Sequence, residues 1–457
     1  MNLSYFISKR IRSAAPHGFS SAIHRIAVMT IALGLAAALV SFLIMLGFQK
    51  TVKDKVFAFS SHLLVTRYTL SNATEEQPFD FRIKLFQNPD TFPFVQRVQP
   101  FAHKAGLIKT DDDVLGIIFK GISDRPTGDG LRQSLVEGRF IAFQDSAVSR
   151  EVMLSRVIAD KIKATVGDAL IIHFLQDPPR SRRLTVVGIY ETNLSDYFDS
   201  KHVIGDLKLV QQLNGWQLFE AGGLEVRTDL EYFPAGLLRE VDYEAYWQYH
   251  VSLIDEDPQL TPLQRQVEYW RTWWRYTFDF DRAALDYQAT LIGQSMDFDL
   301  RLETARDKYI QVFEWLGLIG RQVKILLVII LVVVCVNMIS VVLILVMERT
   351  PMIGMLKAMG GTNRLVRSVF IYNGVSLIVK GLAWGNVIGL GICYVQDRYR
   401  LLKLNPHDYY MDYVPVDWHW PTILALNALT LAVVTLVLLV PTALISRIHP
   451  IRAIKFD

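Results

Sequence analysis

Cysteine is scarce in this 457-residue sequence, and the short motifs of several common enzyme classes are missing. The two cysteines, Cys335 and Cys393, both lie in apolar runs, which excludes a disulfide framework and a cysteine-rich metal site. No Gly-Lys dipeptide occurs, so the chain has no phosphate-binding loop, and it also lacks a nucleophile elbow and an HExxH motif. These absences give no support for catalysis, or for a metal or nucleotide cofactor bound by this chain itself.

An excess of charge of one sign is missing as well. The 48 Lys and Arg residues nearly balance the 45 Asp and Glu residues, for a formal net charge of +3. Proteins that bind nucleic acid usually carry a clear basic excess, so nucleic acid is not an expected partner. Apolar residues make up 51% of the chain and charged residues 20%. This mixture indicates a membrane portion and a water-soluble portion in one chain.

Long apolar runs, by contrast, are present in four places, and each is long enough to cross a bilayer as a helix of roughly 20 residues. The windows are residues 26–48, 323–347, 366–395 and 421–446. Each is predicted to be helical, because a backbone in lipid must satisfy its own hydrogen-bonding groups. The first window is longer than the core of a signal peptide, so we expect a retained anchor.

The charges beside these windows predict the orientation of the chain. Residues 1–25, 348–367 and 447–457 together carry eleven Lys and Arg but only two Asp and Glu. The segment 397–420 carries three bases and four acids. Basic flanks stay in the cytoplasm. Both termini and the 348–365 loop are therefore expected there, whereas residues 49–322 and the short loop 396–420 are expected outside.

Residues 49–322 change from continuous apolar runs to short alternating stretches between turn residues, which indicates soluble mixed structure. The pattern predicts a strand at 62–68, a hairpin around 111–113 and a short helix capped by Ser155. The expected fold class is therefore a membrane α-helical protein with four transmembrane helices. A large α+β domain is inserted between helices 1 and 2.

Two kinds of small or polar residue stand out within the predicted helices. Gly381, Gly385 and Gly389 recur every four residues, a spacing that allows a neighbouring helix to approach closely. Lys380 lies in the same window, where a charge is costly unless it snorkels, pairs or faces water. A role in a hydrated cavity and a merely accommodated lysine both remain open. Asn337 is expected to make an interhelical hydrogen bond.

The loop 348–365 reads ERTPMIGMLKAMGGTNRL and has the end signals of a short helix. Thr350 is the expected N-cap, Pro351 fits the first helical position, and Gly360 with Gly361 can end the helix in a left-handed conformation. One apolar face is expected from Met352, Met355, Leu356 and Met359. Such a helix could lie on lipid or press into a groove of a cytoplasmic protein, and methionine-rich faces suit adaptable protein contacts.

This loop resembles the coupling loop of the FtsX-like and lipoprotein-releasing ABC permeases, which carries Glu-Arg or Glu-Lys, then Ile-Gly, then Leu-Lys-Ala-hydrophobic-Gly. Other segments agree in order. IALGLAAALVSFLIMLGFQK resembles the first helix of that family, and SRVIADKIKATVGDALII with LTVVGIYET resembles its MacB-type periplasmic core. VPTALISRIHPIRAIKF resembles the closing segment. Only residues 230–308 lack a clear match, and they are interpreted as divergent or inserted.

The resemblance implies a type VII ABC permease-like subunit of a bacterial inner membrane, with the large domain in the periplasm. ATP and Mg would be used by a separate dimer of ABC ATPase subunits, which makes this chain a non-catalytic subunit. The implied coupling residues are Glu348, Arg349, Pro351, Met352, Gly354, Met355, Leu356, Lys357, Met359 and Gly360.

The lipoprotein-releasing branch draws lipoprotein acyl chains from the membrane and hands them to a periplasmic chaperone. The expected partners are therefore a lipoprotein substrate, membrane lipid, that chaperone, and a second permease copy or a homologous permease. A cavity for substrate or lipid is expected among Phe42, Met45, Phe48, Asn337 and Lys380.

Two surface features of the outer domain leave alternatives open. A predicted hairpin, shorter than the chaperone-binding hook of that family, carries Pro178, Pro179, Arg180, Arg182 and Arg183. It could contact an acidic partner or be a solvated basic turn. The aromatic-rich segment 240–290 could be a packed face, or a platform for a partner or lipid.

Three functions are compatible with these observations. Lipoprotein release is favoured. A mechanotransmitting permease for another substrate, such as a peptide or toxin exporter or a regulator of cell-wall hydrolases, is the first alternative. A membrane sensor or scaffold that signals through the loop 348–365 is the second.

Overall fold

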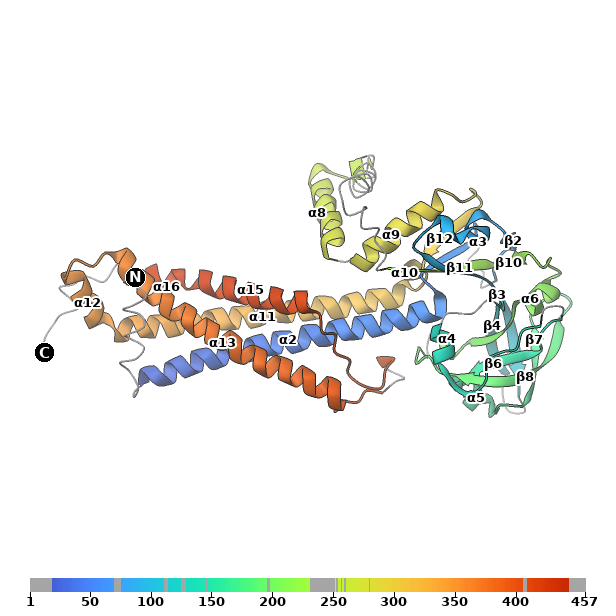
Figure 1. The fold of residues 1–457 in the computed structure, drawn as a ribbon, viewed down its shortest axis with the longest axis horizontal. Coiled ribbons are helices and arrows are strands. Elements are labelled where there is room, and N and C mark those ends of the chain that lie inside the picture. Colours follow the sequence, from blue (N-terminus) through green and yellow to red (C-terminus); the bar gives the residue numbers. More distant parts are fainter. Residues whose placement is uncertain are drawn as a thin grey trace. The chain divides into compact units, whose positions relative to one another are not determined.

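The computed structural model describes residues 19–69, 75–110, 114–124, 129–144, 147–194, 198–230, 251, 254–255, 257–258, 260–278, 280–405 and 409–443 (Figure 1). Two compact units make up the chain. The helical unit comprises Met1–Thr51, Glu314–Asn405 and Met411–Asp457, and the β unit comprises Val52–Phe313 and Pro406–Tyr410. Residues 1–18 and 444–457, which include most of the two predicted cytoplasmic ends, lie outside the described residues.

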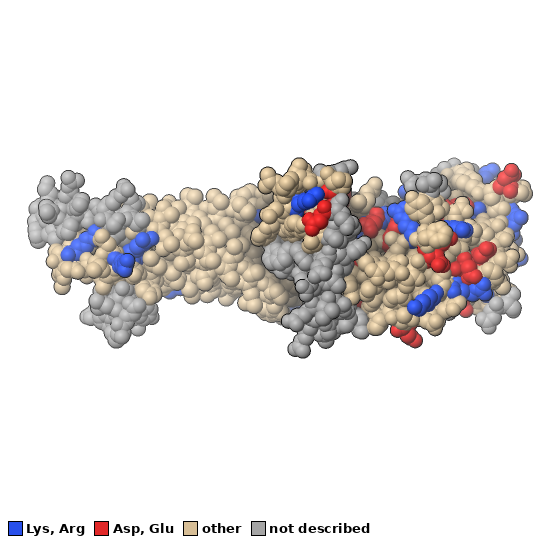
Figure 2. All heavy atoms as spheres, turned by 90° about the horizontal axis from the view of Figure 1, so that it is seen from above, with Lys and Arg blue, Asp and Glu red and all other residues tan. Residues whose placement is uncertain are grey.

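Four helices in the described part of the chain are long and apolar enough to span a membrane. They are α2 (Phe19–Ser60), α11 (Ile310–Glu348), α13 (Asn363–Tyr399) and α15 (Trp420–Val437), which continues into α16 (Leu439–Ala443). The four predicted windows fall on these helices in order. On the face of the helical unit that Figure 2 shows, the long helices carry almost no charged side chains. A charge-free band of this kind suits a lipid environment.

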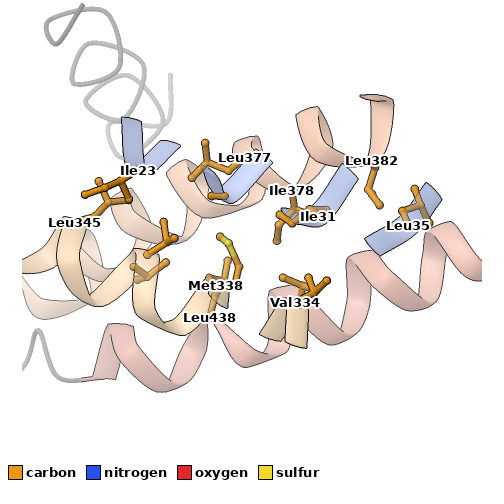
Figure 3. Packing of buried hydrophobic residues seen from close by; sticks show 14 of the residues in the cluster. Ile23, Ile31, Leu35, Val334, Met338, Leu345, Leu377, Ile378, Leu382 and Leu438 are labelled. Carbon is orange, nitrogen blue, oxygen red and sulfur yellow. The ribbon is translucent and has the colours of Figure 1, made fainter. Parts of the chain in front are cut away.

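Helix α2 is the most enclosed of the four. Of its most apolar window 56% is buried, against 22% for α11 and 28% for α13 and α15. The clustered side chains come from several helices and include Ile31, Leu35, Val334, Met338, Leu377, Ile378, Leu382 and Leu438 (Figure 3). Helices α13 and α11 pack directly against it, and α15 packs against α13.

The glycine stripe of α13 lies against α2, as its spacing predicts. A Cβ atom added to Gly381 would lie 2.6 Å from the Ile31 Cβ, and one added to Gly385 would lie 2.9 Å from the backbone oxygen of Ala32. A Cβ atom added to Gly389 would lie 3.0 Å from the Ala36 Cα. The first two distances are shorter than real Cβ contacts and the third is at their lower limit, so the glycines permit this close approach.

The β unit is built on a mixed sheet. Its strands are β1 (Leu63–Arg67), β3 (Val95–Lys109), β4 (Val114–Ile122), β5 (Leu135–Gly138), β6 (Glu151–Ser155), β7 (Ala169–Phe174), β8 (Arg180–Tyr190), β9 (His202–Asp206), β11 (Gly223–Thr228) and β12 (Leu300–Thr304). A separate small pair joins β2 (Phe79–Asp80) to β10 (Glu220–Ala221). Strand β1 lies within the predicted strand 62–68, and β3 pairs antiparallel with β4 as the predicted hairpin requires, although residues 111–113 lie outside the described residues.

Part of this sheet closes on itself. Strand β3 pairs with β4, β4 with β9, β9 with β6, β6 with β8, β8 with β7, and β7 returns to β3. The long strand β3 also pairs with β11, which leads through β1 to β12. Phe119, Val186 and Phe174 are fully or almost fully buried in the core cluster of this unit.

Short helices complete the β unit. They are α3 (Lys84–Gln87), the 3-10 helix η1 (Pro89–Thr91), α4 (Asp129–Gln133), α5 (Arg156–Ile162), α6 (Leu207–Asn214), α8 (Pro262–Phe278), α9 (Phe280–Gly293) and α10 (Ala305–Lys308). The predicted cap is present, because the Ser155 hydroxyl accepts a hydrogen bond of 3.1 Å from the Ile158 amide at the start of α5.

Gly385→Leu is expected to destabilise the helical unit, because a side chain there meets the backbone of α2. Overpacking of this kind costs about 1–3 kcal/mol. Gly391→Leu is the matched control on the same helix, since nothing lies within 4 Å of a Cβ atom built there. The check is thermal unfolding of both purified variants in mild detergent. Equal melting temperatures would contradict the assigned contact.

Candidate functional site

The ten predicted coupling residues lie in one continuous stretch. Glu348 ends α11, Arg349 follows it, and the others lie in or directly after helix α12 (Thr350–Ala358). Gly360 has a φ of +88°, which gives the left-handed termination that the sequence predicts. The amide of Gly361 donates a hydrogen bond of 2.8 Å to the carbonyl of Leu356 and closes the last turn.

The start of α12 differs from the prediction. Arg349, not Thr350, is the N-cap residue, and no side chain caps the helix there. The Thr350 hydroxyl instead donates hydrogen bonds of 2.8 Å and 3.1 Å to the carbonyls of Met347 and Val346 in α11. Because α11 and α12 follow each other almost directly, the free carbonyls at the end of α11 compete successfully for this hydroxyl.

The expected single apolar face of α12 is divided in two. Met352 and Leu356 are partly buried against the core of the helical unit, beside the fully buried Ile353. Met355 and Met359 are 61% and 79% exposed. The first pair fastens α12 to the helical unit, and the second pair is the apolar surface that remains available to a partner.

A groove lies between α2 and α11 within the helical unit. Its larger part has a volume of about 530 Å³ and a smaller part about 340 Å³, with Val333 lining both. The larger part is lined by Ile23, Ile26, Val332, Val333, Val336, Asn337, Ser340, Val341 and Ile344. Because these side chains are almost all aliphatic, the groove suits an apolar ligand.

Of the five predicted cavity residues, only Asn337 lines this groove. Its side-chain amide donates a hydrogen bond of 2.8 Å to the Thr30 hydroxyl, which is the expected interhelical bond and joins α11 to α2. Met45 and Phe48 are buried, and the Phe48 ring lies edge-on to Trp315 with centroids 5.4 Å apart. The structure therefore does not bring the five residues together.

The other two predicted cavity residues also lie apart from the groove. Phe42 is partly buried against the helical core, and Lys380 is exposed on α13. Lys380 does not line the groove, so the groove does not provide the hydrated cavity that was one of its two expected settings.

The predicted basic hairpin is formed by β7 and β8, with residues 175–179 as its turn. Pro178, Pro179, Arg180 and Arg183 are exposed, and Arg182 is half-buried. The Arg180 guanidinium donates to the carbonyls of Leu213 and Gln212, at 3.3 Å and 3.4 Å, near the end of α6. A cation at a helix C-terminus is stabilising, so Arg180 has a structural role within the unit.

The β unit also contains a buried charged cluster that the sequence did not reveal. The Lys120 ammonium lies 2.6 Å from the Glu225 carboxylate, and both side chains are 5% exposed. The ammonium also donates to the Phe59 carbonyl at 3.0 Å and lies 4.5 Å from the centre of the Phe59 ring. Because burial shields both charged groups from water, each group depends on the other to compensate its charge.

Burial also shifts the pKa values of neighbouring titratable groups. Burial, with smaller contributions from His103 and Lys120, lowers the pKa of His202 well below its ordinary value, which leaves the imidazole neutral at pH 7. Burial alone would raise the pKa of Glu76, but the His103 ring 2.6 Å away lowers it overall. Burial raises the pKa of Tyr309 to about 12. Within the described residues, no group of three or more His, Cys, Asp or Glu side chains could hold a metal ion.

Sequence reasoning missed several of these polar contacts. Asn386 and Asn427 exchange hydrogen bonds of 2.7 Å and 3.0 Å between α13 and α15. Both asparagines lie inside apolar windows of the sequence. This placement could have predicted an interhelical hydrogen bond, as it did for Asn337. Lys120 and Glu225 are distant in the sequence, and each lies in an ordinary strand pattern, so nothing local marks them as a pair.

Known proteins match this chain in two parts. The family of MacB-like periplasmic core domains matches residues 26–229, and the FtsX-like permease C-terminal family matches residues 324–450. Residues 230–323 lie between the two matches and include α8 and α9.

Three curated relatives are similar over their full length. The lipoprotein-releasing system transmembrane protein LolE of Haemophilus influenzae is 21% identical over 481 residues, covering 100% of both chains. The lipoprotein-releasing system transmembrane protein LolC of Xylella fastidiosa is 21% identical, and that of Neisseria meningitidis is 20% identical. Each covers 98% of this chain and 97% of the relative.

Two solved structures are similar in part. The periplasmic region of MacB from Actinobacillus actinomycetemcomitans is 12% identical and covers 58% of this chain and 98% of its own, with a TM-score of 0.30. The extracellular domain of the ABC-type transporter YknZ from Gram-positive bacteria is 14% identical and covers 39% of this chain and 86% of its own, with a TM-score of 0.27.

Glu225→Gln is expected to destabilise the β unit by about 3–5 kcal/mol, because it leaves the buried Lys120 ammonium without its countercharge. The double variant Lys120→Met, Glu225→Leu removes both charges and should recover much of that loss. Asp80→Asn, which breaks the exposed pair with Arg82, is the control and should change little. Urea unfolding of the full chain in detergent, followed by circular dichroism, measures all three. A stable single variant would show that the pair is not desolvated.

Proposed function

Because this chain belongs to the FtsX-like ABC permeases that carry a MacB-like periplasmic core domain, we propose that it extracts lipoproteins from the membrane that it spans. The family consists of non-catalytic transmembrane subunits, so an ATPase partner supplies the energy. Full-length similarity to LolC and LolE proteins supports the substrate class, and the aliphatic groove between α2 and α11 is the observation that carries it.

The chemistry of the groove matches the lipid part of a lipoprotein. Acyl chains are apolar and flexible, and a groove of about 530 Å³ with aliphatic walls can receive part of such a chain. Asn337 and Ser340 are the polar side chains in the wall of its larger part.

The proposed drive comes from ATPase subunits that bind ATP and Mg. Met355 and Met359 present an exposed apolar surface on α12, and an ATPase subunit with a matching groove would cover it. Met352 and Leu356 hold the other side of α12 to the helical core. Motion of the ATPase would therefore be passed to the long helices.

The orientation follows from the charge bias of the flanks. We propose that both termini and α12 lie in the cytoplasm of a bacterial inner membrane and that the β unit lies in the periplasm. A second permease, either another copy or a homologous chain, would complete the transporter. A periplasmic chaperone would receive the released lipoprotein.

One observation favours a second candidate, a mechanotransmitting permease for another apolar substrate. The β7–β8 turn is short, and Arg180 at its base is bonded to α6 of the same unit. This hairpin is therefore too short and too closely attached to its own unit to extend toward a chaperone. A peptide or toxin exporter, or a regulator of cell-wall hydrolases, would not require one.

The coupling assignment is tested by the double variant Met355→Asp, Met359→Asp. Two charges in an apolar contact should cost about 3 kcal/mol or more, which weakens binding of the ATPase by roughly a hundredfold. The check is co-purification with the ATPase and lipoprotein release from proteoliposomes. Met355→Leu, Met359→Leu keeps the surface apolar and should retain release. Normal release by the Asp variant would contradict the assignment.

The groove assignment is tested by Val333→Trp, which fills the space between α2 and α11. Release of a labelled lipoprotein should fall by roughly tenfold, equivalent to about 1.4 kcal/mol, while binding of the ATPase is kept. Val387→Trp on α13 is the control, because Val387 is similarly exposed and does not line the groove. If Val333→Trp releases lipoprotein like the wild type, the acyl chain binds elsewhere.

A further inference from the structure

Lys380 is a charged residue in the middle of the spanning helix α13. It is the sole charged side chain between Arg367 and Asp397, thirteen residues after the first and seventeen before the second. At about 1.5 Å per residue, roughly 20 Å and 25 Å of helix separate it from these two charges. The middle of a hydrocarbon core lies about 15 Å from either headgroup layer. A lysine side chain is too short to cover that distance.

The neighbouring helices place Lys380 at the same depth. The next residue of α13 is a glycine, which packs against Ile31 of α2. Thr30, the residue before Ile31, accepts the hydrogen bond from Asn337 of α11. Asn337 lies near the middle of the apolar window 323–347. Lys380 is therefore level with the middle of α11 as well as with the middle of its own helix.

The chain itself leaves Lys380 exposed and without a countercharge among its spans. Helix α13 turns its glycine stripe toward α2 and Asn386 toward α15, while Lys380 lies on another side. Lys380 also lines neither part of the groove. The four apolar windows contain no Asp or Glu. No spanning segment of this chain can therefore balance the ammonium group, and an unpaired charge at this depth is costly.

The residues around Lys380 form a surface that suits another helix. Ser376, Lys380, Ala383 and Trp384 follow spacings of three and four residues and so share one side of the helix, which we call the α13 face. Ala383 is exposed and Ser376 is half-buried, and small side chains let a second helix approach closely. Trp384 is 60% exposed, and exposed aromatic side chains are enriched at protein contacts.

Charge determines which partner fits the α13 face. A second copy of this chain has no acid in its apolar windows, and a two-fold contact through this face would bring two Lys380 side chains together. Lipid phosphates lie at the headgroup level, too far from the middle of α13 for the side chain. A carboxylate in the middle of another protein's helix does balance the charge, because charged groups at membrane depth pair with one another.

We propose that the α13 face binds a transmembrane helix of a different protein, which carries an Asp or Glu in mid-span opposite Lys380. The α13 face neither lines the groove between α2 and α11 nor includes Met355 and Met359. Lipoprotein release by the permease and its ATPase therefore does not require this partner, and the two proposals can fail separately.

The test uses defined transmembrane peptides in place of the natural partner. In the full-length permease, Cys335→Ala and Cys393→Ala remove the native thiols, and Leu401→Cys supplies one exposed position for a donor dye. The labelled protein is reconstituted into liposomes with Leu-Ala peptides of about 20 residues. Each peptide carries an acceptor dye and has Glu, Gln, Leu or Lys at its centre. Energy transfer between the two dyes measures association.

Three variants separate the charge from the face that carries it. Lys380→Leu removes the charge, with Lys380→Met as its replacement if the Leu variant does not fold. Lys380→Glu reverses the charge. The double variant Lys380→Leu, Leu431→Lys moves the charge to α15, where Leu431 is 36% exposed and lies in the middle of the window 421–446.

The Glu peptide is expected to associate severalfold more strongly with the wild type than the Gln and Leu peptides do. Lys380→Leu should abolish this preference, and Lys380→Glu should transfer it to the Lys peptide. Equal association of the Glu, Gln and Leu peptides with the wild type would overturn the proposal, because water or lipid would then surround the ammonium group.

Two further outcomes would also overturn the proposal. If the variant with the charge at Leu431 binds the Glu peptide as well as the wild type does, the α13 face contributes nothing beyond a charge. If donor-labelled and acceptor-labelled permeases associate with each other, and Lys380→Leu abolishes that association, a second copy covers the face.

Discussion

The helical unit depends on the close approach of α2 to two neighbours at once. Toward α13 the approach is permitted by Gly385 and its two companion glycines. Toward α11 it is permitted by Gly34, where an added Cβ atom would lie 2.7 Å from Val334. Helices in lipid gain little from the hydrophobic effect, so van der Waals contact and hydrogen bonds such as Asn337 to Thr30 must hold them together. Gly34 and Val334 at this contact also line the smaller part of the groove between α2 and α11.

Attachment of α12 to the same core follows from how its apolar side chains are divided. A helix that turned all four apolar residues toward a partner would have no firm contact with its own unit. Met352 and Leu356 provide that contact, and Met355 with Met359 remain exposed. A force applied to the exposed pair would therefore reach the spanning helices through packed side chains.

The β unit holds its shape by different means. Strands β3, β4, β9, β6, β8 and β7 close a ring around an apolar core, and the Lys120–Glu225 pair is buried beside the end of α2 at Phe59.

The sequence by itself determined the four spans, the mixed α+β domain, the glycine contact and the left-handed end of α12. These features depend on local composition, on spacing along one helix or on the conformation that one residue permits. Only the tertiary structure decided that Thr350 bonds back to α11, that the face of α12 is divided, and that Asn337 alone of the five cavity residues lines the groove. It also decided the pairing of Lys120 with Glu225. Each of these depends on which neighbour a side chain meets in space, and periodicity along the chain carries no information about that neighbour.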